Sequence, residues 1–301
     1  MPKINQPTGI SIVIPNWNGE KFLPSCLESL LTSIKKTKGF LFEIILVDNA
    51  STDSSISIFN SFFPHKSYFI NHKSILLSTN TGFAYAVNRG IEASGYNYVC
   101  VCNNDLTVDT NWFSEITKTI QSQTDKKIAT FFGLVLNKDG TKIESRGLKF
   151  YPYGKAENID NGISYSKTDN CKLLTDNCFI WGASASIVIY HKPTLLKVGL
   201  FDERFFAYEE DVDLAYRLNK AGFKTLFVPS TISYHLGGGT SSKMGNFRQQ
   251  QDFKNWILFI AKNYNLKEIL ANSPAIFIER LRNFYCLVKS LDRLFHHHSP
   301  V

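Results

Sequence analysis

Four short stretches rich in asparagine, aspartate and glycine each follow a predicted β-strand. They lie at residues 15–19, 48–53, 80–83 and 103–105. The carboxyl ends of parallel strands meet at one edge of an open sheet, and ligands bind in the crevice beyond that edge. Turn formation also explains any one stretch, because these residue types tolerate left-handed backbone and cap helices. Together the four stretches predict a site for a polar small molecule.

Asp105 closes the last of these stretches, directly after the apolar residues 98–102. The chain has neither a Gly-x-Gly-x-x-Gly after the first strand nor a P-loop Gly-Lys-Ser/Thr, so dinucleotide oxidoreductases and P-loop enzymes are disfavoured. The phosphates of a bound nucleotide would need another counter-charge. A divalent cation on Asp105 would supply it, since hard cations prefer carboxylate oxygens and keep positions open for phosphate. The alternative is an aspartate that only caps a helix.

An alternation of strands and helices must position these polar stretches. Apolar runs predict strands at residues 10–15, 43–47, 74–78 and 98–102. Helical periodicity predicts helices at residues 21–36, 83–93 and 111–121. This order indicates βαβ units, a mostly parallel sheet and helices on both of its faces.

The second half of the chain is less regular. Strands are predicted at residues 129–136, 142–150 and 179–190, a loop at 154–170, and a broken strand at 223–228 and 231–235. A helix at residues 211–221 should end at Gly222, in the C′ position. Helical periodicity continues from residue 249 to the end. We expect one large domain at residues 1–245 and a helical appendage at 246–301.

The composition is that of an ordinary globular protein: 301 residues, 44% of them hydrophobic, with six scattered cysteines. No Cys-x-x-Cys pair occurs, which disfavours a disulfide framework or a zinc site. No apolar run reaches the roughly 20 residues that span a bilayer, and the first residues lack a signal-peptide pattern. We therefore expect a soluble, cytoplasmic protein.

The formal charge of +7 raises the question of an anionic partner. The basic residues are dispersed, and no nucleic-acid-binding motif is present, so we expect no nucleic-acid partner. Three explanations of the positive charge remain as alternatives. The partner could be a phosphate-bearing small molecule or an anionic membrane surface, or the protein could be mildly basic with no such partner.

Five motifs in order resemble the family 2 inverting glycosyltransferases, and most closely their rhamnosyltransferase-like branch. They are SIVIPNWNG at residues 11–19, VDNASTDS at 47–54, NTGFAYAVNRGI at 80–91, NND at 103–105 and FDERFFAYEEDVDL at 201–214. Each motif alone is weak, whereas their ordered combination over residues 10–240 is specific. The resemblance implies a GT-A fold, which is a Rossmann-like, mostly parallel sheet flanked by helices, here with a C-terminal helical appendage.

The resemblance also implies a nucleotide-sugar donor, dTDP- or UDP-linked, and a divalent metal ion, Mg²⁺ or Mn²⁺. Asp48 would accept a hydrogen bond from the pyrimidine ring N–H. The other donor-binding positions would be Pro15, Asn16, Asn18, Asn80, Gly82, Asn103 and Asn104. Asp105 is the last carboxylate of the family's Asp-x-Asp position, and the first two places hold asparagine. His235 would join Asp105 at the metal, although a histidine at a strand end is more often structural.

On the acceptor side, the family pattern assigns the catalytic base to Asp211 and acceptor orientation to Glu210. Acidic residues also belong in a first helical turn for reasons of charge alone, and the doubled acid at Glu209 leaves the register open. Asp213 and Arg217, four residues apart, would form an ion pair. The segment of Trp181, Gly182 and Ala183 matches the family's acceptor side, where Trp181 would stack on a sugar or merely pack. A Gly/Ser loop at 237–242 could close over the donor.

The C-terminal helix carries a narrow apolar seam at steps of four and three residues, formed by Phe277, Leu281, Phe284, Val288, Leu291 and Phe295. Basic residues lie among them. Packing on its own domain, a homodimer contact and an amphipathic contact with anionic lipid are the three alternatives. The last would place the protein on the inner face of the cell membrane. Residues 296–298, three histidines, receive no role.

The substrate expected from the resemblance is dTDP-rhamnose, with a UDP-sugar as the second choice. The acceptor expected is a hydroxyl of a surface polysaccharide or of its lipid-linked precursor. A non-catalytic nucleotide- or carbohydrate-binding relative of the same fold is the main rival, and Asp105, Asp211 and His235 argue against it.

Overall fold

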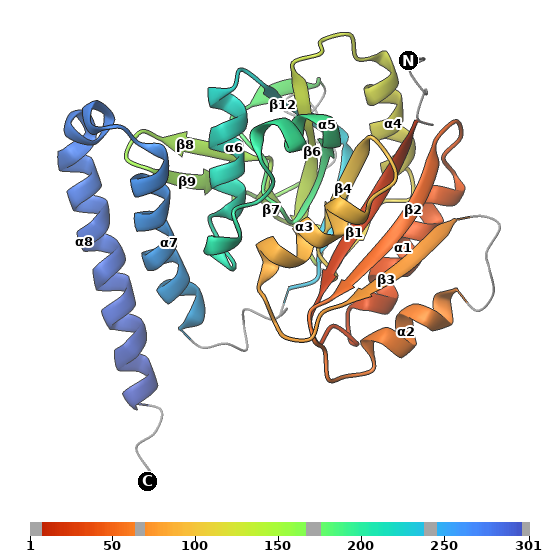
Figure 1. The fold of residues 1–301 in the computed structure, drawn as a ribbon, viewed down its shortest axis with the longest axis horizontal. Coiled ribbons are helices and arrows are strands. Elements are labelled where there is room, and N and C mark those ends of the chain that lie inside the picture. The colour runs from red at the N-terminus through yellow and green to blue at the C-terminus, as the bar shows by residue number, and fades with distance from the viewer. Residues whose placement is uncertain (1–7, 64–69, 167–175, 238–245, 297–301) are drawn as a thin grey trace.

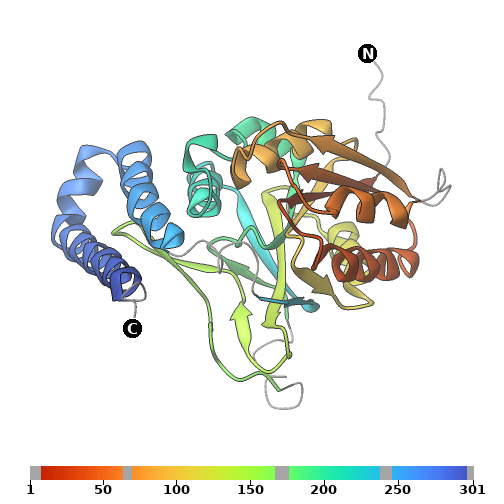
Figure 2. The same ribbon diagram turned by 90° about the horizontal axis from the view of Figure 1, so that it is seen from below.

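The computed structural model describes residues 8–63, 70–166, 176–237 and 246–296, with side chains to residue 289. A ten-stranded sheet forms the centre, in the order β10-β12-β6-β11-β4-β1-β2-β3, with β5 beside β12 and β7 beside β6. Helices α1, α2 and α4 cover one face of the sheet, and α3, α5 and α6 cover the other (Figure 2). Two further helices, α7 and α8, lie at one end of the molecule (Figure 1).

The first half of the chain folds as parallel βαβ units, as predicted. Its elements are β1 (Gly9–Asn16), α1 (Leu23–Lys35), β2 (Leu41–Asp48), α2 (Ser55–Phe62), β3 (Asn71–Leu76), α3 (Phe83–Ala93) and β4 (Tyr98–Cys102). The central strands are apolar at consecutive positions because helices cover both of their faces. Strand β3 lies earlier than the predicted 74–78, and α2 was not predicted. Cys100 and Cys102 are buried in β4.

The second half adds antiparallel pairings, so the sheet is mixed. Its elements up to β12 are β5 (Leu106–Val108), α4 (Trp112–Ser122), β6 (Ile128–Asn137), β7 (Ile143–Ser145), β8 (Leu148–Tyr151), β9 (Lys155–Asn158), β10 (Cys178–Ile180), β11 (Ile187–His191), α5 (Lys192–Val198), the 3₁₀ turn η1 (Glu203–Phe205), α6 (Glu210–Lys220) and β12 (Lys224–His235). Strand β11 runs antiparallel between β4 and β6, whereas β12 runs parallel to β6.

Two predicted strands of this half are in fact broken. The predicted strand 142–150 splits at Gly147, whose φ of 112° is left-handed, so β7 joins the main sheet and β8 pairs with β9 instead. The predicted strand 179–190 splits into β10 and β11, with residues 181–186 between them. The predicted loop 154–170 contains β9, and its residues 167–170 lie outside the described part. Helix α5 was not predicted.

Helix α6 and strand β12 confirm two other predictions. The N–H of Phe223 donates to the carbonyl of Leu218 and that of Gly222 to Asn219, which is a Schellman cap with Gly222 at φ 80°. Strand β12 shifts register between Phe227 and Ile232, where the sequence predicts a break.

The C-terminal helices are α7 (Phe247–Asn263) and α8 (Leu266–His296). Trp256, Phe259 and Ile260 of α7 form a second, smaller core with Leu148 of β8 and Val212 of α6. The predicted domain boundary at 245/246 falls between β12 and α7. Among the described residues, no helix combines the length and apolarity that crossing a bilayer requires.

Candidate functional site

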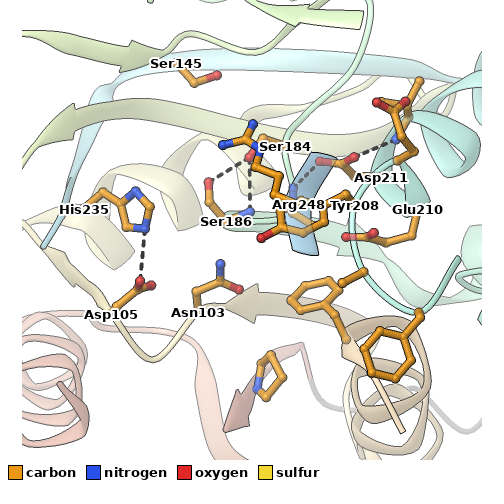
Figure 3. A pocket seen from close by; sticks show the side chains of 18 of the residues that line it. Asn103, Asp105, Ser145, Ser184, Ser186, Tyr208, Glu210, Asp211, His235 and Arg248 are labelled. Carbon is orange, nitrogen blue, oxygen red and sulfur yellow. Dashed lines mark hydrogen bonds and ion pairs between the residues drawn. The ribbon is translucent and has the colours of Figure 1, made fainter. Parts of the chain in front are cut away.

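A cavity of about 530 Å³ opens beyond the carboxyl ends of β1 and β4. One side, here named the strand-end wall, consists of residues following the first four strands: Pro15, Asn16, Trp17, Asn49, Asn80, Gly82, Asn103, Asn104 and Asp105. The other, named the acidic wall, comes from residues 184–186, 206–212 and 247–252. Asp105 and His235 lie on one side of the view in Figure 3, and Glu210 and Asp211 on the other. The four polar stretches therefore do meet at one crevice.

Asparagine side chains tie the strand-end wall together. Register places Asn16 opposite Asp48 on the neighbouring strand. The Asn16 amide donates to Asp48 Oδ1 at 3.0 Å, and Asn104 donates to Asn16 Oδ1 at 2.7 Å. Because each amide has both donor and acceptor, one side chain can link two neighbouring strand ends.

Asn49 repeats this arrangement one loop further along. Its amide nitrogen donates to Asn80 Oδ1 at 3.0 Å and to the Gly82 carbonyl at 3.1 Å, while its oxygen accepts from the Thr81 N–H at 2.8 Å. Sequence reasoning did not select Asn49, although it stands beside Asp48 in the same polar stretch. The signal was therefore present but not used.

Two predicted donor residues, Asp48 and Asn18, are not among the residues that line the cavity. Asp48 is 4% exposed and accepts from the Asn16 amide and the Ser51 N–H. Asn18 has a left-handed φ of 51°, and its side chain accepts from the Thr52 N–H. Both side chains join the loop after β1 to the loop after β2.

Asp105 and His235 meet as the resemblance implied. His235 Nε2 lies 3.2 Å from Asp105 Oδ2, and its Nδ1 lies 2.9 Å from Glu144 Oε2. Burial alone would lower the pKa of His235, but the hydrogen bonds to both carboxylates outweigh it and raise the pKa to about 10. Glu144 lines the cavity and was not predicted, because it reaches His235 from 91 residues away.

The donor set fits a divalent cation in part. One imidazole nitrogen and one carboxylate oxygen 3.2 Å apart could both reach one ion, and Glu144 would fix the imidazole tautomer from behind. Within the described ranges, no group of three or more His, Cys, Asp or Glu side chains is arranged to hold a metal. Such an ion would therefore need ligands from a bound phosphate or from water, as Mg²⁺ and Mn²⁺ commonly do.

The carboxyl groups of the acidic wall are poorly solvated. Asp211 Oδ2 accepts from the Ala185 N–H at 3.1 Å and Oδ1 from the Val212 N–H at 2.8 Å. Glu210 is 6% exposed, and one of its oxygens has no hydrogen-bond partner. Burial raises the pKa of Asp211, and burial together with the Asp211 charge raises that of Glu210 well above its usual range. Burial and the Asp211 charge also raise the pKa of Glu209, to about 8.

Asp213 does not line the cavity and forms structural contacts with α6 and α7 instead. It is fully buried and bonds to Arg217 at 2.8 Å, which confirms the predicted pair, and also to Lys262 and Asn263 of α7.

Trp181, Gly182 and Ala183 do not line the cavity. The Trp181 ring stacks on Phe150 with centroids 4.4 Å apart, and Gly182 lies so close to Ala215 that an added Cβ would sit 2.7 Å from it. The next residues of the segment, Ser184 to Ser186, line the cavity instead, and the N–H of Asn103 donates to the Ser186 carbonyl at 2.8 Å. Of the predicted closing loop at 237–242, only Gly237 is among the described residues; residues 238–242 lie outside them.

Three residues of α7 complete the acidic wall: Phe247, Arg248 and Asp252. The Arg248 guanidinium lies 5.4 Å from the centre of the Tyr208 ring, and its Nε is 3.7 Å from Asp252 Oδ2. Burial raises the pKa of Asp252, while Arg248 opposes that rise. The sequence offered no signal for these residues, because no motif covers residues 247–252.

The fold and the cavity at its strand ends define a GT-A glycosyltransferase. GalNAc-T7, solved with UDP, GalNAc and Mn²⁺, superimposes with a TM-score of 0.61 at 17% identity, over 85% of this chain and 48% of that one. A family model described as "Glycosyl transferase family 2" matches residues 11–164. The chain therefore belongs to glycosyl transferase family 2 and is a glycosyltransferase.

Two curated proteins are similar to parts of this chain. The amylovoran biosynthesis glycosyltransferase AmsB of Erwinia amylovora is 25% identical over 235 residues, which is 75% of this chain and 69% of that protein. The N-acetylglucosaminyl-diphospho-decaprenol L-rhamnosyltransferase of Mycobacterium tuberculosis (strain H37Rv) is 33% identical over 82 residues, which is 27% of each chain. The present chain thus spans only part of the length of each of these proteins.

Proposed function

We propose that the chain is a metal-dependent inverting glycosyltransferase that moves a sugar from a nucleoside diphosphate to an acceptor hydroxyl. The observation that carries this proposal is the pairing of Asp105 and His235 on one side of a cavity whose other side holds Asp211. A leaving group and an attacking hydroxyl on opposite faces of one sugar would need such an arrangement.

Asp105 and His235 would hold the metal ion, with Glu144 orienting the imidazole. Bound there, a divalent cation would offset the charge that develops on the departing diphosphate. The Mn²⁺ in the structure of GalNAc-T7 supports this assignment, as does the place of Asp105 at the end of the strand-end wall.

The strand-end wall would bind the nucleotide. Pro15, Asn16, Asn80, Gly82, Asn103 and Asn104 line it, and Asp48 and Asn18 fix the loops behind it. In this proposal Asp48 turns an oxygen toward the ring N–H that uracil and thymine share. The L-rhamnosyl activity in the name of the mycobacterial relative supports dTDP-rhamnose as first choice, with a UDP-sugar second.

Asp211 would act as the general base. Burial raises its pKa, and the carboxylate gains affinity for the proton that an attacking hydroxyl must lose. The hydroxyl attacks the anomeric carbon from the face opposite the diphosphate, and the proton passes to Asp211. Glu210, with its unpartnered oxygen, would accept a hydrogen bond from the acceptor or donate one to it. Trp181, Gly182 and Ala183 would support acceptor binding through the adjoining Ser184–Ser186.

The outer face of α8 would bind an anionic membrane. Leu270, Phe277, Ile278, Phe284 and Tyr285 are each more than half exposed on it. Exposed Lys267, Arg282 and Lys289 accompany them, whereas Glu279 of the same helix is buried and Glu268 bonds to the Asn265 N–H. In a two-fold dimer through this face, the basic side chains of one copy would face those of the other and repel them. Anionic lipid headgroups would neutralise the same charges. The side chains of Leu291 and Phe295, also in the predicted seam, lie outside the described residues.

Sedimentation with vesicles tests the membrane contact. We expect the protein to bind vesicles that contain one-third phosphatidylglycerol and to bind pure phosphatidylcholine vesicles only weakly. The double variant Phe277→Ser/Phe284→Ser should lose binding to the anionic vesicles. If the protein instead fails to bind vesicles and forms a concentration-dependent dimer that the same double variant abolishes, the membrane contact is contradicted. The face of α8 would then be a homodimer interface. A lipid-facing helix suits a lipid-linked acceptor, which the decaprenol in the name of the mycobacterial relative also supports.

Thermal unfolding with dTDP, UDP, GDP or NADH, with and without Mn²⁺, tests the donor class. A ligand at 100 times its Kd adds roughly 2.7 kcal/mol to the free energy of unfolding. A Mn²⁺-dependent rise in Tm with dTDP or UDP alone is expected. If no pyrimidine nucleotide raises Tm, the donor assignment fails and a carbohydrate-binding role takes its place.

A further inference from the structure

The loop that leads into Asp211 has an unusual backbone. Between η1 and α6, Phe206, Tyr208 and Glu209 have φ values of 62°, 68° and 67°. Residues other than glycine rarely adopt the left-handed region, and such a strained backbone persists only where its surroundings impose it. Something outside the loop must therefore hold it in place.

Asn255 of α7 forms hydrogen bonds with the backbone of this loop. It is fully buried, and its Nδ2 lies 2.8 Å from each of three carbonyl oxygens, those of Phe205, Ala207 and Tyr208. Three acceptors around one nitrogen fix which end of the amide faces the loop. Two N–H groups are shared among three carbonyls, so the side chain binds the loop as a clamp rather than through one bond.

The start of α3 also holds this loop. The Phe206 carbonyl accepts from the N–H of Phe83 at 2.6 Å and of Ala84 at 3.3 Å, at the start of α3. The backbones approach so closely that a Cβ on Gly82 would lie 2.5 Å from the Phe206 oxygen. Four successive carbonyls of the loop, from Phe205 to Tyr208, are therefore fixed from outside it.

We infer that Asn255 is a positioning residue that holds this loop, and with it the carboxylate of Asp211, in place for proton transfer. The inference rests on the proposed function of Asp211 and goes beyond it, because it assigns a task in the active site to α7. The loop ends at Glu209, the N-cap of α6, and Glu210 and Asp211 are the next two residues. A loop released by loss of Asn255 would shift the start of α6 relative to the donor.

This role predicts an effect on turnover that differs from its effect on donor binding. The strand-end wall, which would bind the nucleotide, makes its own hydrogen bonds and does not contact Asn255 through any of them. Misplacement of a catalytic group by about 1 Å can lower a rate about 100-fold. Asn255 should therefore influence kcat and leave the affinity for nucleoside diphosphate largely unchanged.

Two substitutions separate the donated bonds from the volume of the side chain. Asn255→Leu has a similar size and donates nothing, while Asn255→Ser keeps one donor. Asn263→Leu serves as the matched control, since Asn263 lies on the same helix and donates to Asp213 at 2.9 Å and to Phe259 at 3.1 Å, away from the loop. Four quantities are measured in each variant: kcat for donor turnover with Mn²⁺, the Kd of the nucleoside diphosphate, Tm, and amide hydrogen exchange of residues 205–211.

We expect kcat to fall about 100-fold in Asn255→Leu and about 10-fold in Asn255→Ser, with Kd changed less than about threefold. Exchange in residues 205–211 should rise in both, and neither change should occur in Asn263→Leu. The inference is overturned if the control loses as much kcat as the Asn255 variants, or if kcat and exchange are unchanged in both Asn255 variants. It is also overturned if neither Asn255 variant folds while the control does. If the wild type turns over no nucleotide sugar, the proposed function fails, and exchange alone still decides whether Asn255 holds the loop.

Discussion

The two walls of the cavity are built in different ways. In the strand-end wall, short polar loops follow parallel strands, and Asn16, Asn49 and Asn104 join neighbouring loops by paired amide bonds. In the acidic wall, a strained loop is held by a helix that begins some 40 residues later, and the Glu209 and Glu210 carboxyls each leave an oxygen without a partner. Most amides of the first wall are paired before any ligand arrives, although Asn103 Oδ1 has no partner, whereas the second wall keeps two carboxyl oxygens that a ligand could satisfy.

This difference suggests a division of labour between binding and chemistry. A wall of mostly paired amides suits recognition of a ligand of fixed shape. Buried carboxyl groups with raised pKa values are typical of proton transfer. Substitutions in the two walls should therefore separate affinity for the nucleotide from turnover, and four predictions test that separation.

Asp211→Asn should give the largest effect, a loss of kcat of about 1,000-fold, since general-base catalysis contributes about 10²–10⁴-fold. The Asn side chain keeps the acceptor for the Ala185 N–H but takes up no proton. Nucleoside diphosphate affinity, measured by calorimetry, should stay within about threefold of the wild type. Parallel losses of turnover and affinity would mean that Asp211 belongs to the binding wall.

Asp105→Ala should weaken binding of the nucleoside diphosphate about 100-fold with Mn²⁺ present. The substitution leaves His235 as the remaining one of the two proposed protein ligands, and His235 alone should not retain the metal ion. Without Mn²⁺, wild type and variant should bind almost equally. The comparison is made by titration in the presence and absence of EDTA. An equal loss in both conditions would remove the metal from the explanation.

The strand-end wall was largely predictable from the sequence, whereas only residues 209–211 of the acidic wall were. Each loop of the first wall follows its own apolar strand, so local pattern and the geometry of a parallel sheet place Asn16, Asn80 and Asp105 together. The second wall depends on contacts between segments far apart in the chain, such as Ala185 with Asp211 and Asn255 with Phe205. No periodicity encodes such contacts.

Two further details escaped sequence reasoning for the same reason. The resemblance predicted Trp181 on the acceptor side, whereas its ring stacks on Phe150 and the adjoining Ser184–Ser186 line the cavity. The break at Gly147 depends on Gly182 and Ile180, which approach it too closely for any side chain. Motifs thus identified the segments, and tertiary packing decided which of their residues face the cavity.

Asn49→Asp should raise the KM for the donor about tenfold and leave kcat nearly unchanged. The substitution keeps the acceptor for the Thr81 N–H and removes the donor to Asn80 and Gly82, a loss of two hydrogen bonds worth about 1 kcal/mol each. Steady-state kinetics measure it, with Asn60→Asp, an exposed position on α2, as control. A loss confined to kcat would contradict the assignment of this wall to binding.

Glu209→Gln should produce the smallest effect, a change in how stability depends on pH. In the folded protein, burial and the Asp211 charge raise the Glu209 pKa to about 8, against an ordinary value of 4.5 in the unfolded chain. Below pH 4.5 the Glu209 carboxyl is protonated in both the folded and the unfolded chain, so the full contribution of Glu209 to the free energy of unfolding is present. As the pH rises from 4.5 through 8, the unfolded chain releases its proton first, and the free energy of unfolding falls.

A glutamine at this position has no proton to release. The free energy of unfolding, measured by urea denaturation from pH 5 to 8, should therefore fall less steeply in Glu209→Gln than in the wild type, while Glu28→Gln, at an exposed position on α1, should follow the wild-type curve. Asp252, whose pKa burial also raises, keeps part of the slope in place. Identical slopes in all three proteins would mean that Glu209 is ionised in the fold, and the acidic wall would then lack the desolvation that sets it apart from the strand-end wall.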